Sequence, residues 1–185
     1  MIRLFVAIEL PEPIRNYLLR LQTGIRAAYW QRDDQLHLTL SFIGDVDEGT
    51  ARDIDTALAT ITMPAFTIAL DGAGLFGTMF KPRILWAGIA PRDPVIRLHD
   101  KIETAIRRLG LQLDDRKFAP HATLARIRDG RAAAPGVLQF LEAHGGLISA
   151  SFEVNSFALY SSKLTDQGPQ YHVEARYPLA GFADL

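Results

Sequence analysis

The hydrophobic residues of this chain follow two periods, one typical of strands and one typical of helices, and the resulting order of elements occurs twice. The first half predicts a strand, a helix, a strand, a helix and a strand, at residues 3–8, 11–27, 36–43, 48–61 and 66–70. The second half repeats this order at residues 84–89, 94–109, 118–127, 137–144 and 151–160. A closing strand is predicted over residues 170–178, after the turn signal Gly168-Pro169.

A four-residue motif recurs at the same place in each half, as HLTL at residues 37–40 and HATL at residues 121–124. The distance from the first strand to the motif is 30 residues when counted from Ala7 to His37, and 34 when counted from Ala87 to His121. Spacing this similar through a helix and two strands indicates an ancient duplication.

The duplication predicts the fold. The class is α+β, with two pseudo-symmetric βαβαβ-like lobes whose largely antiparallel sheets surround a central cleft. Because no Gly/Ser-rich linker separates the halves, we expect one domain over residues 1–185, with lobes at approximately 1–80 and 81–185.

The repeated motif predicts a catalytic pair. Successive side chains of a strand point to opposite faces, so His37 and Thr39 project together, as do His121 and Thr123. Two imidazoles can act as general base and general acid, and two hydroxyls can donate to an anion. Phosphodiester cleavage needs this combination. Imidazoles with an ordinary pKa of about 6.5 predict a bell-shaped rate with its optimum near neutrality.

A histidine in a strand is most often an ordinary core or surface residue, and the recurrence is what favours catalysis for His37 and His121. His99 and His144 lie outside the repeat and are predicted as helix-surface residues. Zinc usually takes three or four protein ligands, and the motif partners are threonines, so we expect no metal.

Composition excludes several other classes of protein. Lys and Arg number 20 against 21 for Asp and Glu, and the net charge of -1 argues against a strongly basic, non-specific nucleic-acid binder. The absence of cysteine excludes disulfides and thiolate nucleophiles. Residues 1–10 lack the features of a signal peptide, and no apolar run is long enough for a membrane span, so we expect a cytoplasmic protein that binds no membrane.

The motifs and their surroundings resemble the two-histidine phosphoesterases, and most closely the bacterial and archaeal RNA 2′,3′-cyclic phosphodiesterases, also called 2′-5′ RNA ligases. The segments that carry the resemblance are RLFVAIELP, HLTLSFIG, RILWAGI, RKFAPHATLARIR and GPQYHVEARYPL. The resemblance implies hydrolysis of 2′,3′-cyclic phosphates at RNA 3′ ends to 2′-phosphomonoesters, without a metal or nucleotide cofactor. It also implies that His37 is the proton donor and His121 the proton acceptor. We expect the enzyme to be a monomer.

Arg126 ends an HxTLxR extension that the family shares, and it suits a phosphate. Strict alternation puts it on the face opposite His121, so it reaches the site only if the strand bends or ends near Ala125.

Four aromatic residues are further candidates for contact with substrate. By strict alternation Phe42 falls on the face of the motif leucines, which favours a core position over substrate binding. Phe5 and Tyr171 are candidates for stacking on a terminal base, with a core position equally open for Phe5. Trp86 has the same ambiguity.

Other functions stay open at this point. The same site suits a 2′-5′ oligoadenylate or a small cyclic nucleotide, and the reverse reaction would join RNA ends by a 2′-5′ bond. The repeated motifs are also compatible with a binding module that holds a nucleotide or RNA end without turnover.

Overall fold

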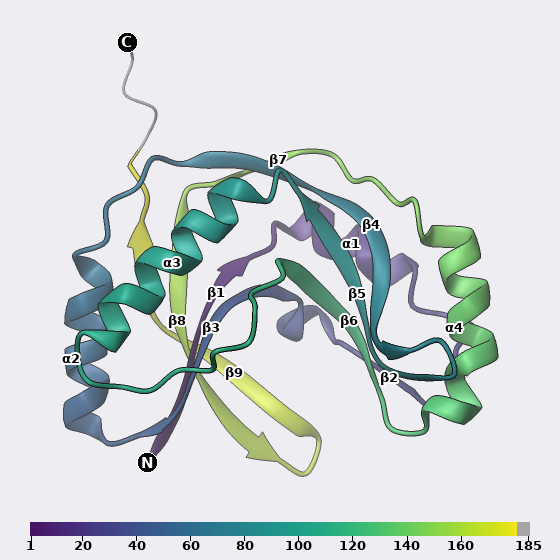
Figure 1. Cartoon of the computed structure of the whole chain (residues 1–185), viewed down its shortest axis with the longest axis horizontal. Coiled ribbons are helices and arrows are strands. Elements are labelled where there is room, and N and C mark those ends of the chain that lie inside the picture. Colours follow the sequence, from purple (N-terminus) through teal and green to yellow (C-terminus); the bar gives the residue numbers. More distant parts are fainter. Residues whose placement is uncertain (181–185) are drawn as a thin grey trace.

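The computed structural model describes residues 1–180 and consists of strands and helices in close to the predicted order (Figure 1). The strands are β1 (Ile2–Glu9), β2 (Ala28–Trp30), β3 (His37–Val46), β4 (Phe66–Thr78), β5 (Lys81–Ala90), β6 (His121–Ile127), β7 (Phe152–Val154), β8 (Ser156–Thr165) and β9 (Gly168–Pro178). The helices are α1 (Glu12–Arg20), α2 (Glu48–Ala59), α3 (Asp93–Arg107) and α4 (Gly130–His144), with a 3-10 turn η1 at Asp33–Gln35.

Two predicted helix boundaries are wrong. The helix predicted over 11–27 ends at Arg20, and the chain then passes through Gly24 and Ala27, whose φ angles of 79° and 61° are incompatible with a continuing right-handed helix. The helix predicted over 137–144 starts earlier, because the Asp129 side chain accepts a hydrogen bond from the Ala132 backbone N–H and caps the first turn.

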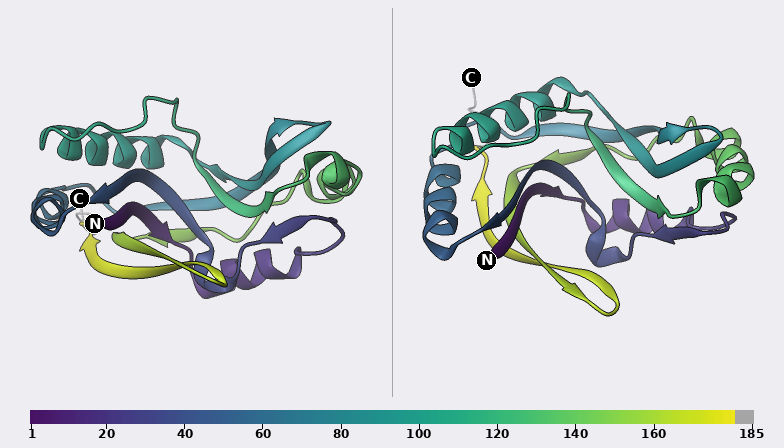
Figure 2. Two further views of the ribbon diagram at one scale, coloured as in Figure 1. Left: turned by 90° about the horizontal axis from the view of Figure 1, so that it is seen from below. Right: turned by 60° about the horizontal axis from the view of Figure 1, so that its bottom comes forward.

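All strand pairings are antiparallel, in the order β7-β4-β5-β6-β3-β1-β8-β9, with β2 added beside β6. The sheet is strongly curled rather than flat (Figure 2). The predicted α+β class with antiparallel sheets and an internal duplication is therefore confirmed.

The two lobes exchange strands. The first lobe contains β3, β1, β8 and β9, and the second contains β6, β5, β4 and β7. Thus β4, from the first half of the chain, completes the second lobe beside β5, while β8, from the second half, completes the first lobe beside β1. The repeats predict lobes of residues 1–80 and 81–185, whereas in the structure each repeat gives its last strand to the other lobe.

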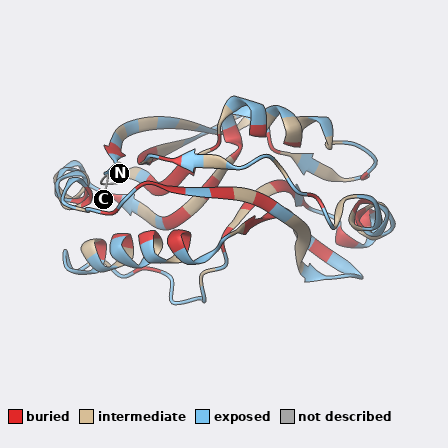
Figure 3. Cartoon of the chain, turned by 90° about the horizontal axis from the view of Figure 1, so that it is seen from above, coloured by how far each residue is buried: buried red, intermediate tan, exposed pale blue. Residues whose placement is uncertain are grey.

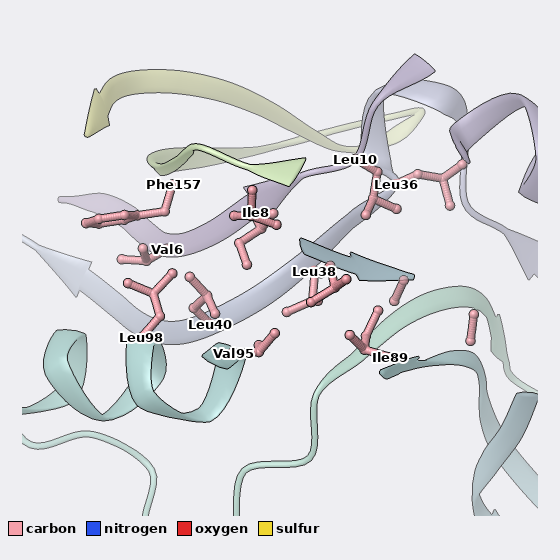
Figure 4. Close-up of a cluster of buried hydrophobic side chains, with 14 of the residues drawn as sticks. Val6, Ile8, Leu10, Leu36, Leu38, Leu40, Ile89, Val95, Leu98 and Phe157 are labelled. Carbon is pink, nitrogen blue, oxygen red and sulfur yellow. The ribbon is translucent and has the colours of Figure 1, made fainter. Parts of the chain in front are cut away.

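The main hydrophobic core lies between the sheet and the helices, with α3 packed on β3 and α4 packed on β4 and β5. Buried residues follow the sheet-facing sides of the helices (Figure 3). Leu38 and Leu40 point from β3 toward Val95 and Leu98 of α3 (Figure 4), and all four are at most 1% exposed. The face of β3 that carries His37 and Thr39 is therefore the face turned away from the helices.

Close approach of β4 to β5 depends on one glycine. Leu70 pairs with Ile89 and Ala73 with Ala87, so two residues of β4 bulge opposite Gly88. A Cβ on Gly88 would overlap the backbone carbonyl oxygen of Asp71. Gly88 in turn pairs with His121, so this close packing lies directly beside the second motif.

We expect Gly88→Ala to lower the free energy of unfolding by about 1–3 kcal/mol, because the added methyl forces the two strands apart. Gly146→Ala is the matched control: a Cβ there meets no atom within 4 Å among the described residues, so stability should be unchanged. Urea denaturation measures both. Equal midpoints for the two variants would contradict the close packing at Gly88.

Candidate active site

Both motifs begin a strand, and the two strands meet at the motifs. Leu38 of β3 pairs with Ala122 of β6, and both side chains are fully buried. Their neighbours therefore project from the opposite face, where antiparallel geometry places His37 across from Thr123 and Thr39 across from His121. We call this side of the sheet the motif face. The two His-Thr pairs are related there by a local two-fold axis.

Each imidazole is oriented by the backbone carbonyl two residues before it. His121 Nδ1 lies 2.6 Å from the Ala119 oxygen. The Gln35 backbone stands at the equivalent place before His37 and raises its pKa. A carbonyl only accepts, so in neutral His121 Nδ1 carries the proton and Nε2 is the free base. Nε2 of His37 lies 3.0 Å from Oγ1 of Thr39, so the imidazole and the hydroxyl of the first motif are hydrogen-bonded to each other.

Both imidazoles are neutral at pH 7 in the free protein. Burial lowers the pKa of His37 to about 4, against the opposing effect of the Gln35 backbone. The charge of Arg126 lowers this pKa further, as does the charge of His121 when that ring is protonated. Burial also lowers the pKa of His121, with a contribution from Arg126 in the same direction. The Arg126 charge therefore acts on both histidines.

A bulge in β3 brings Phe42 to the motif face. Val6 of β1 pairs with Ser41, and Ala7 pairs with Thr39, which leaves Leu40 as the extra residue. Leu40 and Ser41 are consequently both buried, and the alternation of faces reverses after them. Phe42 is 62% exposed, so the predicted core position is wrong.

The same bulge occurs in β6. Leu85 pairs with Ala125 and Trp86 with Thr123, so Leu124 is the extra residue and is buried together with Ala125. Strict alternation predicts Arg126 on the face opposite His121, but after the bulge its exposed side chain is on the same face. The fifth residue after each motif histidine is thus on the motif face, Phe42 in the first lobe and Arg126 in the second.

Aromatic rings surround His37 in the first lobe. Phe5 is 3% exposed, with its ring 5.1 Å from the imidazole and stacked on Tyr160 at 5.0 Å. Tyr171 is half-buried, and its ring meets the His37 ring edge-on at 5.4 Å. Phe5 lies in a small buried cluster on this face and packs beneath His37, a support role that sequence alternation left open. Tyr160 is a neighbour of His37 that the sequence pattern did not indicate.

His121 has a parallel environment in the second lobe. The Phe76 ring meets the imidazole edge-on at 4.9 Å, and the Trp86 ring lies 6.4 Å away. A Cβ on Gly74, which pairs with Trp86, would overlap the indole, so this glycine makes room for the ring. Phe76 lies beyond the strand predicted over 66–70, which in the structure continues to Thr78, so the sequence pattern did not indicate it.

Helix α3 holds the β3 bulge through two side chains one turn apart. His99 Nδ1 lies 2.7 Å from the Leu40 carbonyl oxygen, and the Ser41 hydroxyl donates to Glu103 at 2.7 Å. The His99 ring also stacks on Phe118 at 3.9 Å, three residues before the second motif. His99 is therefore half-buried and connects the two motifs, so its prediction as a helix-surface residue is wrong.

Within residues 1–180, no three His, Cys, Asp or Glu side chains are grouped so that they could hold a metal ion. Over the same range, no helix has the length and apolar character needed to cross a membrane. Two surface hollows of about 650 and 630 Å³ contain none of the motif residues.

Comparison with known families shows the class of protein. The model of the LigT like Phosphoesterase family matches residues 8–86 and, a second time, residues 89–171. The chain therefore belongs to the LigT-like phosphoesterase family, and the expected resemblance is confirmed.

Individual relatives cover most of the chain. An RNA 2′,3′-cyclic phosphodiesterase of Aeropyrum pernix is 37% identical over 140 residues, which are 75% of this chain and 79% of that protein. The enzyme of the same name from Escherichia coli is 30% identical over 189 residues, 96% of each chain.

Solved structures show the same architecture. A Thermus thermophilus protein gives a TM-score of 0.82 at 28% identity, covering 98% of this chain and 100% of that one. Escherichia coli LigT complexed with 3′-AMP gives 0.78 at 29% identity, covering 96% and 98%.

The pKa values of the two histidines test the electrostatics of the site. In an NMR titration of the free protein we expect His37 to stay neutral down to about pH 4, and His121 to titrate below its ordinary value. Arg126→Gln should raise both pKa values, because it removes a positive charge that opposes protonation. The control Arg52→Gln, on α2, should change neither. Unchanged histidine pKa values in the Arg126 variant would contradict the placement of its charge.

Proposed function

We propose that this protein hydrolyses the 2′,3′-cyclic phosphate at the 3′ end of RNA and leaves a 2′-phosphomonoester. The observation that carries the proposal is the two-fold arrangement of His37, Thr39, His121 and Thr123 on one face, with the carbonyls oriented so that Nε2 is the reactive nitrogen. The curated relatives of Aeropyrum pernix and Escherichia coli, both named RNA 2′,3′-cyclic phosphodiesterases, support this substrate class. The Escherichia coli LigT complex with 3′-AMP supports a nucleotide ligand on this fold.

The two histidines act on opposite sides of the phosphorus atom. Neutral His121 accepts a proton from water at Nε2 as the water oxygen bonds to phosphorus. Protonated His37 gives its proton to the 3′ oxygen as the bond from phosphorus to that oxygen breaks. The phosphate stays on the 2′ oxygen, and His121 ends protonated while His37 ends neutral, so exchange with solvent restores the starting forms.

The threonines donate hydroxyl hydrogens to the non-bridging phosphate oxygens, where negative charge increases in the transition state. In the free protein the Thr39 hydroxyl is hydrogen-bonded to His37 Nε2. A protonated Nε2 accepts no hydrogen bond, so protonation of His37 releases Thr39 to bind the phosphate.

Phe42 and Arg126, the residues after the two bulges, determine the orientation in which the substrate binds. Phe42 offers an exposed ring 6.0 Å from the ring of Phe5, which in turn contacts His37, and suits the base of the terminal nucleotide. Arg126 is on the side of His121 and suits the negative charge of the phosphate. A nucleoside on the first lobe presents its leaving oxygen to His37, while water approaches from the second lobe, in agreement with the proposed roles.

One chain supplies every residue of this site, so we propose that the enzyme acts as a monomer on RNA ends. By microscopic reversibility the same groups also join a 2′,3′-cyclic end to a 5′-hydroxyl as a 2′-5′ bond.

RNA with a 2′,3′-cyclic end tests the proposal directly. His37→Ala and His121→Ala should each lower turnover by about 10²- to 10⁴-fold, because each removes one positioned proton transfer. The double variant should be little worse than the worse single variant, since the two residues act as a unit. His172→Ala, an exposed histidine on β9, is the matched control and should retain full activity.

The product of this reaction should resist a phosphatase that removes only a 3′-phosphate, and activity should persist in excess EDTA. A 3′-phosphate product would refute the orientation of the substrate. Near wild-type turnover in either histidine variant would refute the two-histidine mechanism. Binding of the RNA end without any turnover would favour a binding module instead.

The lowered pKa values of His37 and His121 predict a pH optimum below the near-neutral one that imidazoles of ordinary pKa would give. The active form has one histidine protonated and one neutral, and in the free protein this form is most populated between two values that both lie below 6.5. The profile of kcat/KM, which reports the free enzyme, should therefore be a bell with its maximum below pH 6.5. Bound phosphate raises both pKa values, so the kcat profile should peak at higher pH. A kcat/KM that only rises with pH would remove the general acid.

A further inference from the structure

A row of paired residues crosses the second lobe beside His121. It runs from β4 to the edge strand β2 through the pairs Phe76–Ile84, Ile84–Arg126 and Arg126–Tyr29. Directly paired residues project from the same face of a sheet. Because the Phe76 ring contacts the His121 ring, the whole row lies on the motif face.

Arg128 extends this row away from the histidines. Its guanidinium carbon lies 4.4 Å from the centroid of the Tyr29 ring, which is 52% exposed. Arg128 therefore shares the motif face with Arg126, about 7 Å farther along the chain at the rise of a strand. Stacking on Tyr29 occupies one flat face of the guanidinium and leaves its in-plane N–H groups available to an anion.

Arg126 and Arg128 have no acidic partner in the part of the chain that the structure describes. On the motif face of the first lobe, charged side chains next to the Phe5 cluster are matched in ion pairs, Arg3–Asp45 at 3.0 Å and Arg176–Glu9 at 2.7 Å. Within residues 1–180, neither Arg126 nor Arg128 forms an ion pair. The motif face thus has a local excess of positive charge on the second lobe only, in a protein whose net charge is -1.

We propose that Arg128, held by Tyr29, binds the phosphate that joins the terminal nucleotide of the RNA to the nucleotide before it. The proposal rests on the proposed function, in which Arg126 faces the cyclic phosphate at the end of the strand. Cations placed in sequence beside aromatic rings are a general means of following a single-stranded backbone. A mononucleotide lacks this second phosphate, so the subsite makes the enzyme select oligonucleotide ends over free cyclic nucleotides.

Two substrates separate the subsite from the catalytic centre: adenosine 2′,3′-cyclic phosphate, and an adenosine dinucleotide with the same cyclic end. The wild type should have the higher kcat/KM on the dinucleotide. Arg128→Gln should lower kcat/KM on the dinucleotide about tenfold or more, as expected for loss of a charged hydrogen bond, and change it less than about twofold on the mononucleotide. Arg52→Gln, an exposed arginine on α2, is the matched control and should change neither value.

Tyr29 is a positioning residue in this proposal, and its conservative variant tests that role. Tyr29→Phe keeps a ring beneath the guanidinium and should keep the preference for the dinucleotide. Tyr29→Leu removes the ring and should lower kcat/KM on the dinucleotide by about two- to fivefold, with the mononucleotide value unchanged.

A dinucleotide with a neutral methylphosphonate linkage identifies the group that Arg128 binds. The wild type should have about the same kcat/KM on this substrate as on the mononucleotide. Arg128→Gln should not lower this kcat/KM further. The slope of log kcat/KM against log salt on the ordinary dinucleotide should also become shallower by about 0.7 in the variant, as for one lost phosphate contact.

The outcomes that overturn the subsite differ from those that overturn the function. If Arg128→Gln lowers kcat/KM equally on both cyclic substrates, Arg128 is a general structural residue. If the variant also lowers kcat/KM on the methylphosphonate dinucleotide, Arg128 contacts a base rather than the linking phosphate. If the wild type turns over neither substrate, the proposed function fails. Binding of a fluorescent RNA with a terminal 2′-phosphate then decides the subsite, and an equal Kd for wild type and Arg128→Gln overturns it.

Discussion

The paired position of Leu38 and Ala122 is the constraint on which the chemistry depends. Both side chains are completely buried against the core, so the residues on either side must project from the other face. Antiparallel pairing then places a histidine of one strand across from a threonine of the other, at a separation set by the backbone, about 4.5–5.5 Å between Cα atoms. The proposed acid, base and hydroxyl donors are consequently held by the sheet itself, which is a more rigid support than a loop.

The surroundings of each imidazole have two opposing effects on its pKa. Aromatic rings and burial favour the neutral form, whereas the backbone carbonyl behind Nδ1 favours the charged form, and burial dominates in both cases. Two neutral imidazoles beside the Arg126 guanidinium make the free site cationic without a protonated histidine. An anionic phosphodiester is attracted to this charge, and on arrival it reverses the electrostatic bias against protonation.

The sequence predicts the parts of this structure that depend on local pattern. His37, Thr39, His121 and Thr123 are recognisable because their spacing repeats, and alternation correctly places them on one face with Leu38 and Ala122 on the other. Alternation fails two residues later, because a bulge depends on the partner strand. The sequence does contain one indication of the bulge. A small residue, Ser41 or Ala125, follows the leucine that ends each motif, so both positions can be buried. Tyr160, Phe76 and His99 reach the site from distant segments, and no local pattern identifies them.

The exchange of the last strands has a consequence for the origin of the protein. A chain half this long could not complete its own sheet, but two copies about a two-fold axis would complete each other, as domain-swapped homodimers do. In such an ancestor the residues after both bulges would be identical. Met79 and Phe80 form the short β4–β5 hairpin that joins the two halves. Fusion of two copies at this hairpin would make the two positions separate genetic sites. One position could then become the aromatic Phe42 and the other the cationic Arg126. The two histidines, equivalent in a symmetric ancestor, would in this way come to have different neighbours and different roles in proton transfer.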